Sequence, residues 1–213
     1  MKISIDGNIG SGKTFYLKKL EEDGYIVNYD RTDKWFDWFE KYNCGMDRYA
    51  LGLQLQILYD QLDWPYEPGQ LNIYERSPYT LKNIFADFLY EQKIFDHQEY
   101  QLHNLYIKKF GWQPDIIIYL YCDHDVCYQR IKNRFSITED EKSTTDCLEK
   151  LHIKHEIVFD DLNCKIPIYK INAVEDPQTI YNSITEILKK LSQSISNERE
   201  VRSYRPEVVL GII

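Results

Sequence analysis

The sequence predicts an α/β protein in which a five-stranded parallel sheet is flanked by helices. Three observations predict it: short apolar runs recur along the chain, longer amphipathic segments separate them, and a glycine-rich loop follows the first run. Apolar runs that are nearly continuous are typical of parallel strands buried on both faces. Their alternation with helical segments provides the crossover connections that a parallel sheet requires.

The expected strands are short and rich in β-branched or aromatic residues. The clearest reads DIIIYLY at residues 115–121, directly after Pro114. Pro68 and Gly69 precede another, which indicates a turn before that strand. The five expected strands are residues 2–6, 25–30, 71–75, 115–121 and 166–171.

The segments between the strands have the apolar spacing of amphipathic helices. The expected helices are residues 13–22, 47–62, 81–110, 125–135, 144–162 and 177–191. Residues 1–191 are therefore predicted to form one domain, a size that suits a single core. Residues 192–213 lose the periodicity and end in VVLGII. We expect a C-terminal tail there, which is flexible, an edge strand or a subunit contact.

Composition excludes some classes of partner. The 213 residues carry a formal net charge of −8 and no basic run, so no nucleic acid polymer is expected as a partner. The five cysteines form no C-x-x-C pair, which favours reduced thiols. No run of about 18 apolar residues is present, so we expect no membrane partner and a cytoplasmic location.

The loop after the first strand matches the phosphate-binding pattern G-x-x-x-x-G-K-[ST] in full. Glycines let the backbone curl so that N–H groups point at phosphate oxygens, and the start of the next helix adds positive charge. The lysine reaches the β- and γ-phosphates, and the threonine hydroxyl can ligate Mg²⁺. The expected phosphate-binding residues are Gly7, Asn8, Ile9, Gly10, Ser11, Gly12, Lys13 and Thr14.

This P-loop predicts a bound nucleotide without separating kinases from GTPases or ATPases. The chain has no N-K-x-D motif of the kind that reads a guanine base. Its small size favours a kinase of a small molecule over a motor.

Charged residues end two other strands on the rim where the P-loop lies and where ligands of parallel sheets bind. Asp30 could accept the proton of an attacking hydroxyl group. Glu75 could orient Mg²⁺ through water, and Arg76 could bridge the transferred phosphate and its acceptor. From the residues alone, a surface salt bridge and a solvated aspartate remain open alternatives.

Taken together, these motifs resemble the deoxynucleoside kinases of eukaryotes and viruses. That family includes the deoxycytidine, deoxyguanosine and mitochondrial thymidine kinases and the insect multisubstrate enzyme. The resemblance covers residues 1–171 and implies a P-loop kinase fold, ATP and Mg²⁺ as cofactors, a small-molecule nucleoside substrate and a homodimer. It rests on GNIGSGKT at residues 7–14, a carboxylate followed by Lys-Trp within residues 30–35, ERS at residues 75–77 and RIKNR at residues 130–134.

The resemblance implies roles for residues outside the P-loop. Asp30 stands where the family has the glutamate that acts as general base on the 5′-hydroxyl, and Arg31 follows where proline is usual. Trp35 matches the tryptophan that lines the nucleoside cleft. Gln54 matches the amide that hydrogen-bonds the base edge, and Phe85 falls where an aromatic ring stacks on the base.

Residues 130–141 resemble the family's short lid. Its arginines, here Arg130 and Arg134, would clamp the phosphates as the lid closes. Ser136 stands where the family usually has a third arginine, so lid electrostatics differ or another cation substitutes.

The remaining implied contacts concern the sugar and the size of the base. Glu139 matches the glutamate that holds the 3′-hydroxyl, and Tyr42 matches its tyrosine partner after a one-residue gap. Ile57 and Leu81 fall where the family tunes pocket size. Bulk at position 81 should crowd a purine, so we expect thymidine and deoxycytidine as substrates.

Two other functions remain open at this point. A thymidylate kinase would share the P-loop, lid and sheet, and Arg76 and Arg31 could hold the acceptor's own phosphate. A non-catalytic nucleotide-binding module is favoured only by the aspartate at position 30 and the serine at position 136.

Overall fold

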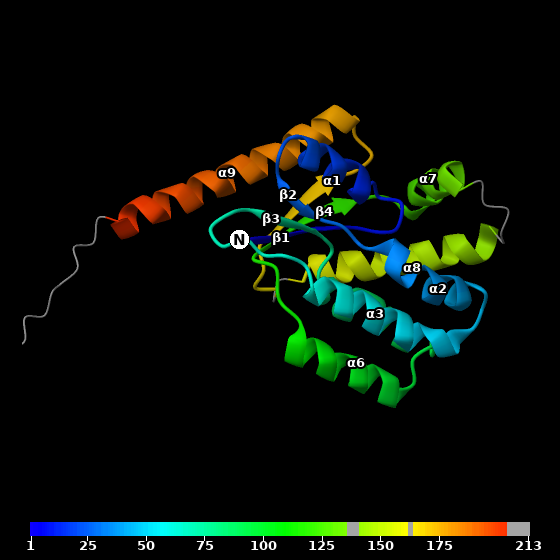
Figure 1. The fold of residues 1–213 in the computed structure, drawn as a ribbon. Coiled ribbons are helices and arrows are strands. Elements are labelled where there is room, and N and C mark those ends of the chain that lie inside the picture. The colour runs from blue at the N-terminus through cyan, green and yellow to red at the C-terminus, as the bar shows by residue number, and fades with distance from the viewer. Residues whose placement is uncertain (136–140, 162–163, 204–213) are drawn as a thin grey trace, which may run out of the picture.

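The computed structural model describes residues 1–135, 141–161 and 164–203. Its core is a five-stranded sheet with the strand order β2-β3-β1-β4-β5, and every pairing is parallel, as predicted (Figure 1). The strands are β1 (Lys2–Asp6), β2 (Ile26–Asn28), β3 (Asn72–Glu75), β4 (Ile116–Tyr121) and β5 (Ile168–Asn172). The α-helices are α1 (Lys13–Glu22), α2 (Thr32–Asn43), α3 (Ala50–Leu62), α4 (Pro78–Thr80), α5 (Asp87–Glu91), α6 (His97–Phe110), α7 (His124–Phe135), α8 (Glu141–Phe159) and α9 (Pro177–Ser203). A 3-10 turn, η1 (Asp47–Tyr49), precedes α3, and a π-helical segment, η2 (Leu81–Ala86), joins α4 to α5.

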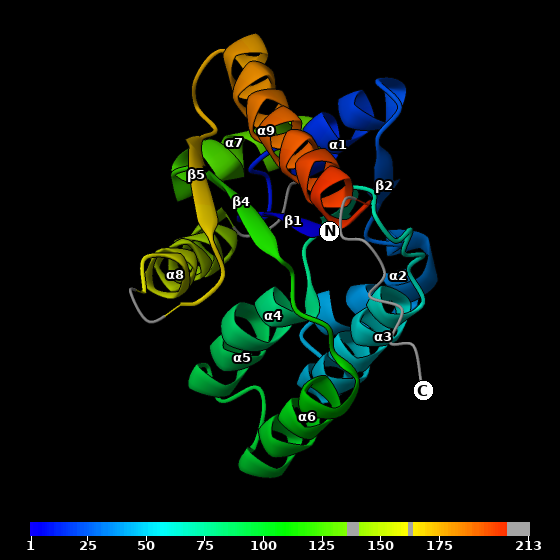
Figure 2. The same ribbon diagram turned by 90° about the vertical axis from the view of Figure 1, so that its left-hand side faces the viewer.

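Helices cover both faces of the sheet (Figures 1 and 2). On one face, α1, α7 and α9 bury apolar side chains such as Leu17 and Ile184 against Ile5 of the central strand. On the other face, α3, η2, α5 and α8 pack around Ile117 and Tyr119 of β4. Strands enclosed in this way must be apolar on both sides, which explains the nearly continuous apolar runs.

The central position of β1 determines where the site forms. Ile5 pairs with Glu75 of β3 and with Ile118 of β4, so the three strands end along one rim. The P-loop, which follows β1, and the charged residues after β2 and β3 therefore meet at this rim.

Two helix predictions need correction, and one helix was not predicted. Residues 81–110 do not form one helix, because the chain turns after Glu91 through Lys93, which has a φ of 61°, and α6 starts at a capping box made by Asp96 and Glu99. Helix α2 was not predicted, and none of its residues is fully buried. Helix α9 continues to Ser203 instead of ending at Leu191.

None of the helices described is long and apolar enough to cross a membrane.

Candidate active site

The P-loop passes so close to its neighbours that glycine is required at two positions. A Cβ atom on Gly7 would lie 2.6 Å from the carbonyl oxygen of Leu120, and one on Gly10 would lie 2.6 Å from that of Cys127. Both residues have positive φ angles, 148° and 83°. The loop is thus wedged between the ends of β4 and α7, which fixes the direction of its N–H groups.

Lys13 begins α1 and is buried against the loop that precedes it. Its Nζ donates hydrogen bonds to the carbonyl oxygens of Gly7, at 3.0 Å, and Asn8, at 2.8 Å. Burial, and then the positive charge of Arg76, lower the pKa of Lys13 from 10.5 to about 7. The Lys13 side chain is therefore only partly protonated near neutral pH, and a neighbouring negative charge would favour its charged form.

Nucleotide binding is expected to take up a proton at pH 8. Phosphate charge next to Lys13 favours the ammonium form and should raise its pKa from about 7 towards the ordinary value. Calorimetric titrations with ADP at pH 8, in two buffers of different ionisation enthalpy, should show uptake of close to one proton. At pH 6, where Lys13 is already charged, uptake should nearly vanish, and equal heats in both buffers at pH 8 would contradict the assignment.

A chain of polar contacts links the P-loop to the ends of β2 and β3. The Thr14 hydroxyl donates to Glu75 Oε1 at 2.8 Å, and the Asp30 amide donates to Glu75 Oε2 at 3.4 Å. Arg76 then donates from its guanidinium to Asp30 Oδ2 at 2.6 Å. Four residues from three segments, all predicted to lie on this rim, are therefore in contact with one another.

Asp30 has a pKa that lies closer to neutral pH than that of an ordinary aspartate. Its side chain is only 8 % exposed. Burial raises the pKa of Asp30 to about 6, Arg76 opposes this shift, and the negative charge of Glu75 adds to it. A group with a pKa close to the working pH can accept a proton in a reaction and release it afterwards.

Arg76 is held in an unusual backbone conformation. Its φ is 65°, in the left-handed region that side chains other than glycine adopt at an energetic cost. The guanidinium carbon lies 5.1 Å from the centre of the Phe85 ring, a cation–π contact. Its Nε has no hydrogen-bond partner within the described part of the chain, so Arg76 retains an unused donor at the site.

The oxygen atoms of Thr14 and Glu75 suit a magnesium ion. Mg²⁺ prefers oxygen ligands and commonly binds one or two protein groups together with substrate phosphates. A hydroxyl and a carboxylate 2.8 Å apart at the start of α1 provide such a pair.

The predicted nucleoside-binding residues come from three neighbouring elements. Phe85 connects two apolar clusters: it packs with Ile57 against Leu81, and with Tyr42 against the cluster that contains Ala50. Two polar atoms of the predicted nucleoside-binding residues, Gln54 Oε1 and Trp35 Nε1, are buried without a hydrogen-bond partner among the described residues. Helix α2 supplies Trp35 and Tyr42, α3 supplies Gln54 and Ile57, and η2 supplies Leu81 and Phe85.

Arg130 lies beside the P-loop and contacts main-chain atoms. Its guanidinium donates to the carbonyl oxygens of Ser11, at 3.1 Å, and Ala173, at 2.7 Å. It therefore joins the P-loop to the end of β5. The Arg134 side chain, Ser136 and Glu139 lie outside the described residues, so their part in a lid stays a prediction.

Asp6 is a buried carboxylate close to the site. It was not among the residues predicted from the sequence. It is fully buried at the end of β1 and accepts hydrogen bonds from Thr80 Oγ1, at 2.6 Å, and from Ser4 Oγ. Burial raises the pKa of Asp6. Its contacts fix α4 against β1, and so position the turn that carries Arg76. The available signal was its place as the last strand residue before the P-loop.

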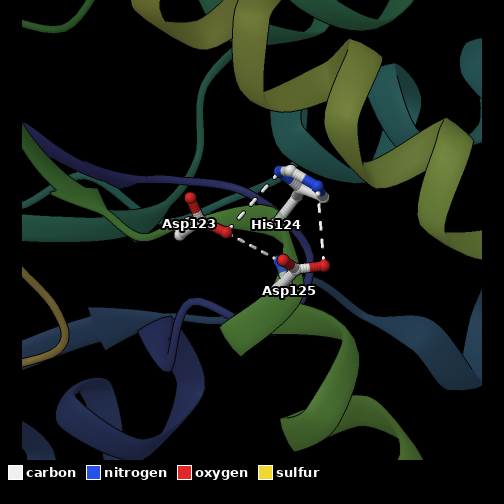
Figure 3. Close-up of side chains that lie close together, drawn as sticks. All are labelled: Asp123, His124 and Asp125. Atoms are coloured by element: carbon white, nitrogen blue, oxygen red, sulfur yellow. Dashed lines mark hydrogen bonds and ion pairs between the residues drawn. The ribbon is translucent and has the colours of Figure 1, made fainter.

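A separate group of charged residues lies at the start of α7 (Figure 3). His124 lies between two carboxylates, 3.6 Å from both Asp123 and Asp125. Asp123 Oδ1 also accepts the Asp125 amide at 2.9 Å, as a residue capping a helix does. Possible ligand atoms of all three lie within 4.8 Å of one another. Since helix capping and contacts between neighbouring side chains account for this arrangement, we assign no metal to this group.

Comparison with known proteins agrees with this geometry. The family model described as deoxynucleoside kinase matches residues 3–196. The chain is 31 % identical over 208 residues to a probable deoxycytidine kinase of Fowlpox virus (strain NVSL), which covers 92 % of this chain and 88 % of that protein. It is 28 % identical to the deoxycytidine kinase of Homo sapiens over an alignment of 245 residues, covering 91 % and 92 % of the two chains.

A solved structure shows the same fold. The deoxyadenosine kinase from M. mycoides superposes with a TM-score of 0.76 at 21 % identity, over 90 % of this chain and all of that one. The fold of this chain thus agrees with that of a solved deoxynucleoside kinase. Its sequence matches the family model over residues 3–196. The chain belongs to the deoxynucleoside kinase family and is a phosphotransferase that acts on nucleosides.

Proposed function

We propose that this protein transfers the γ-phosphate of ATP to the 5′-hydroxyl of a pyrimidine deoxynucleoside, with Asp30 as the general base. The observation that carries the proposal is the contact chain from Thr14 through Glu75 and Asp30 to Arg76. A carboxylate with a raised pKa therefore lies near the phosphate loop, which supports its role as the base that accepts the proton of the acceptor hydroxyl.

On the donor side, the P-loop amides and Lys13 hold the β- and γ-phosphates. Thr14 and, through water, Glu75 would hold Mg²⁺, which would neutralise charge on the phosphates. Arg130 is braced against Ser11 at the edge of this loop. Arg134, the next arginine of the lid motif, is proposed to contact the phosphates.

On the acceptor side, Arg76 engages Asp30 Oδ2, so Oδ1 is the oxygen that receives the proton of the 5′-hydroxyl. Arg76 then stabilises the charge that passes from the donor to the acceptor. Tyr42 and Glu139 hold the 3′-hydroxyl.

The base is proposed to lie between Trp35, Gln54 and Phe85. Leu81 and Ile57 fill the space that the larger ring of a purine would need, which favours thymidine and deoxycytidine. Both relatives described above are named as deoxycytidine kinases, which supports a pyrimidine.

The decisive experiment measures ADP release from Mg²⁺·ATP with thymidine, deoxycytidine, deoxyadenosine, deoxyguanosine and thymidine monophosphate, each alone. Phosphorylation of the pyrimidine nucleosides is expected. Higher kcat/KM for the purines would overturn the role of Leu81. Reaction of the monophosphate alone would make the protein a thymidylate kinase, and nucleotide binding with no turnover would make it a binding module.

We also propose a homodimer formed through α3 and α6, which lie side by side (Figures 1 and 2). Both helices have apolar side chains that face away from the core, and Leu105 is 62 % exposed. Residues three or four apart on α6 form one stripe. The exposed apolar residues of the two helices are Tyr59, Leu62, Leu102, Leu105, Tyr106 and Phe110.

Leu105→Glu is expected to convert the dimer to a monomer, because a carboxylate would be buried in an apolar interface without a partner. Sedimentation velocity measures the change. Gln193→Glu adds the same charge at an exposed position of α9 and should leave the dimer intact. A wild-type protein that sediments as a monomer at all concentrations would contradict the proposal.

A further inference from the structure

Helix α3 contains a glycine, Gly52, at a position where the backbone alone does not require one. Glycine loses more conformational freedom than alanine when a helix forms, so a glycine inside a helix makes that helix less stable. Gly52 does not have a positive φ angle, unlike Gly45 in the turn before it. The reason for a glycine here must therefore lie in what approaches the helix.

The side chain that approaches Gly52 is Trp38 of α2. A Cβ atom on Gly52 would lie 2.3 Å from Cζ3 and 2.7 Å from Cε3 of the Trp38 ring, closer than two unbonded carbon atoms can come. The same ring contacts Tyr49, which precedes α3, with ring centres 5.9 Å apart and planes at 65°. The missing side chain at Gly52 thus leaves a gap on α3, and the Trp38 ring fills it.

Trp38 lies in the middle of the face of α2 that meets the site. Trp35 lies three residues before it and Tyr42 four residues after it, so the three side chains share one face of the helix. Trp35 and Tyr42 are the two half-buried residues of α2, and both are proposed to contact the nucleoside. Tyr42 packs in the same apolar cluster as Phe85. The contact with Gly52 is therefore made between two proposed substrate contacts.

Helix α2 is otherwise weakly attached to α3. No residue of α2 is fully buried, so the helix has no side chain embedded in the core. Its first turn is tied to α3 by an ion pair between Lys34 and Asp60, at 3.9 Å. The Lys34 side chain is 34 % exposed, and ion pairs at exposed positions contribute little to stability. The position of α2 thus depends largely on the contact between Trp38 and Gly52.

We infer that Gly52 and Trp38 are positioning residues for the nucleoside, because their contact fixes α2 against α3 and so places Trp35 and Tyr42. This inference rests on the proposed function, which assigns nucleoside contacts to those two side chains. A methyl group at position 52 would force the Trp38 ring away from α3. Either α2 moves with the ring, or the ring turns into solvent and α2 loses the contact. Nucleoside binding is disturbed in both cases, whereas the P-loop, which lies between β1 and α1, is not.

The test is a double-mutant cycle in which KM for ATP and KM for the preferred nucleoside are measured separately. Gly52→Ala should raise KM for the nucleoside about tenfold and leave KM for ATP within about twofold of wild type. Trp38→Leu removes the ring that fills the gap. In that background, Gly52→Ala should change KM for the nucleoside by less than about twofold, because the added methyl group meets no ring. Phe36→Leu shortens an exposed ring on the same helix and should behave as wild type.

Amide hydrogen exchange provides a second measurement that does not depend on catalysis. Residues 32–43 should exchange faster in Gly52→Ala than in wild type, whereas exchange in α1 should be unchanged. An unchanged KM for the nucleoside in Gly52→Ala, an equal rise in KM for ATP, or an equal effect in both backgrounds would each overturn the inference. If wild type phosphorylates no nucleoside while exchange in α2 still rises, the contact holds the helix and it is the proposed function that fails.

Discussion

Lys13→Ala is expected to lower kcat for phosphoryl transfer by about a thousandfold, because it removes the cation closest to the transferred group. The fold should persist, since the change deletes a buried lysine whose pKa is already lowered to about 7. ADP release at saturating ATP and nucleoside measures the effect, and circular dichroism checks the fold. Lys18→Ala, on the exposed side of the same helix, is the matched control. A Lys13→Ala protein that keeps a tenth of the wild-type rate would place the catalytic cation elsewhere.

Asp30→Asn is expected to reduce kcat by a factor of about 10² to 10⁴, the usual contribution of a general base. Asparagine keeps the shape of the side chain and can still accept the hydrogen bond from Arg76, so the geometry should persist. Asp33→Asn, at an exposed position in the first turn of α2, is the control and should retain activity. Retention of wild-type kcat in the Asp30 variant would show that the base lies elsewhere.

The same carboxylate predicts how activity depends on pH. With a pKa raised to about 6, Asp30 is ionised and able to accept a proton above pH 6, and it becomes protonated below. The kcat/KM of wild type should therefore fall about tenfold per unit below pH 6, whereas the residual rate of Asp30→Asn should lack this slope.

As the pH rises through about 6, the contribution of Asp30 to stability should fall, whereas the activity should rise. Because the folded pKa of Asp30 lies above its ordinary value of 3.8, the group stabilises the fold in its protonated form, and this contribution is lost as the pH rises through about 6. At pH 8, Asp30→Asn should thus unfold at a temperature no lower than that of wild type. A clear drop there would mean that the charged carboxylate is needed for folding.

Local patterns in the sequence were sufficient for the sheet and the phosphate loop. Buried parallel strands have a composition that depends little on context, and Gly7–Lys13 must have glycines wherever the backbone approaches Leu120 and Cys127. Helix α2 was missed because it contributes no fully buried residue to the core. The turn after Glu91 was missed although Asp96 and Glu99 form a capping box that the sequence contains.

Parts of the candidate site depend on contacts between distant segments. Asp6 accepts a hydrogen bond from Thr80, which lies 74 positions away, and no local pattern in the sequence indicates this contact. The pKa of Lys13 depends on packing, so its value could not be read from the motif.

The left-handed backbone at Arg76 bears on how this enzyme could be engineered. Glycine adopts a φ of 65° without the penalty of roughly 1–2 kcal/mol that a side chain incurs there. Selection for heat resistance alone should therefore favour glycine at position 76, and would remove the guanidinium that contacts Asp30. A laboratory library enriched only by survival at high temperature would converge on robust proteins that no longer phosphorylate anything, so turnover has to be screened in the same round.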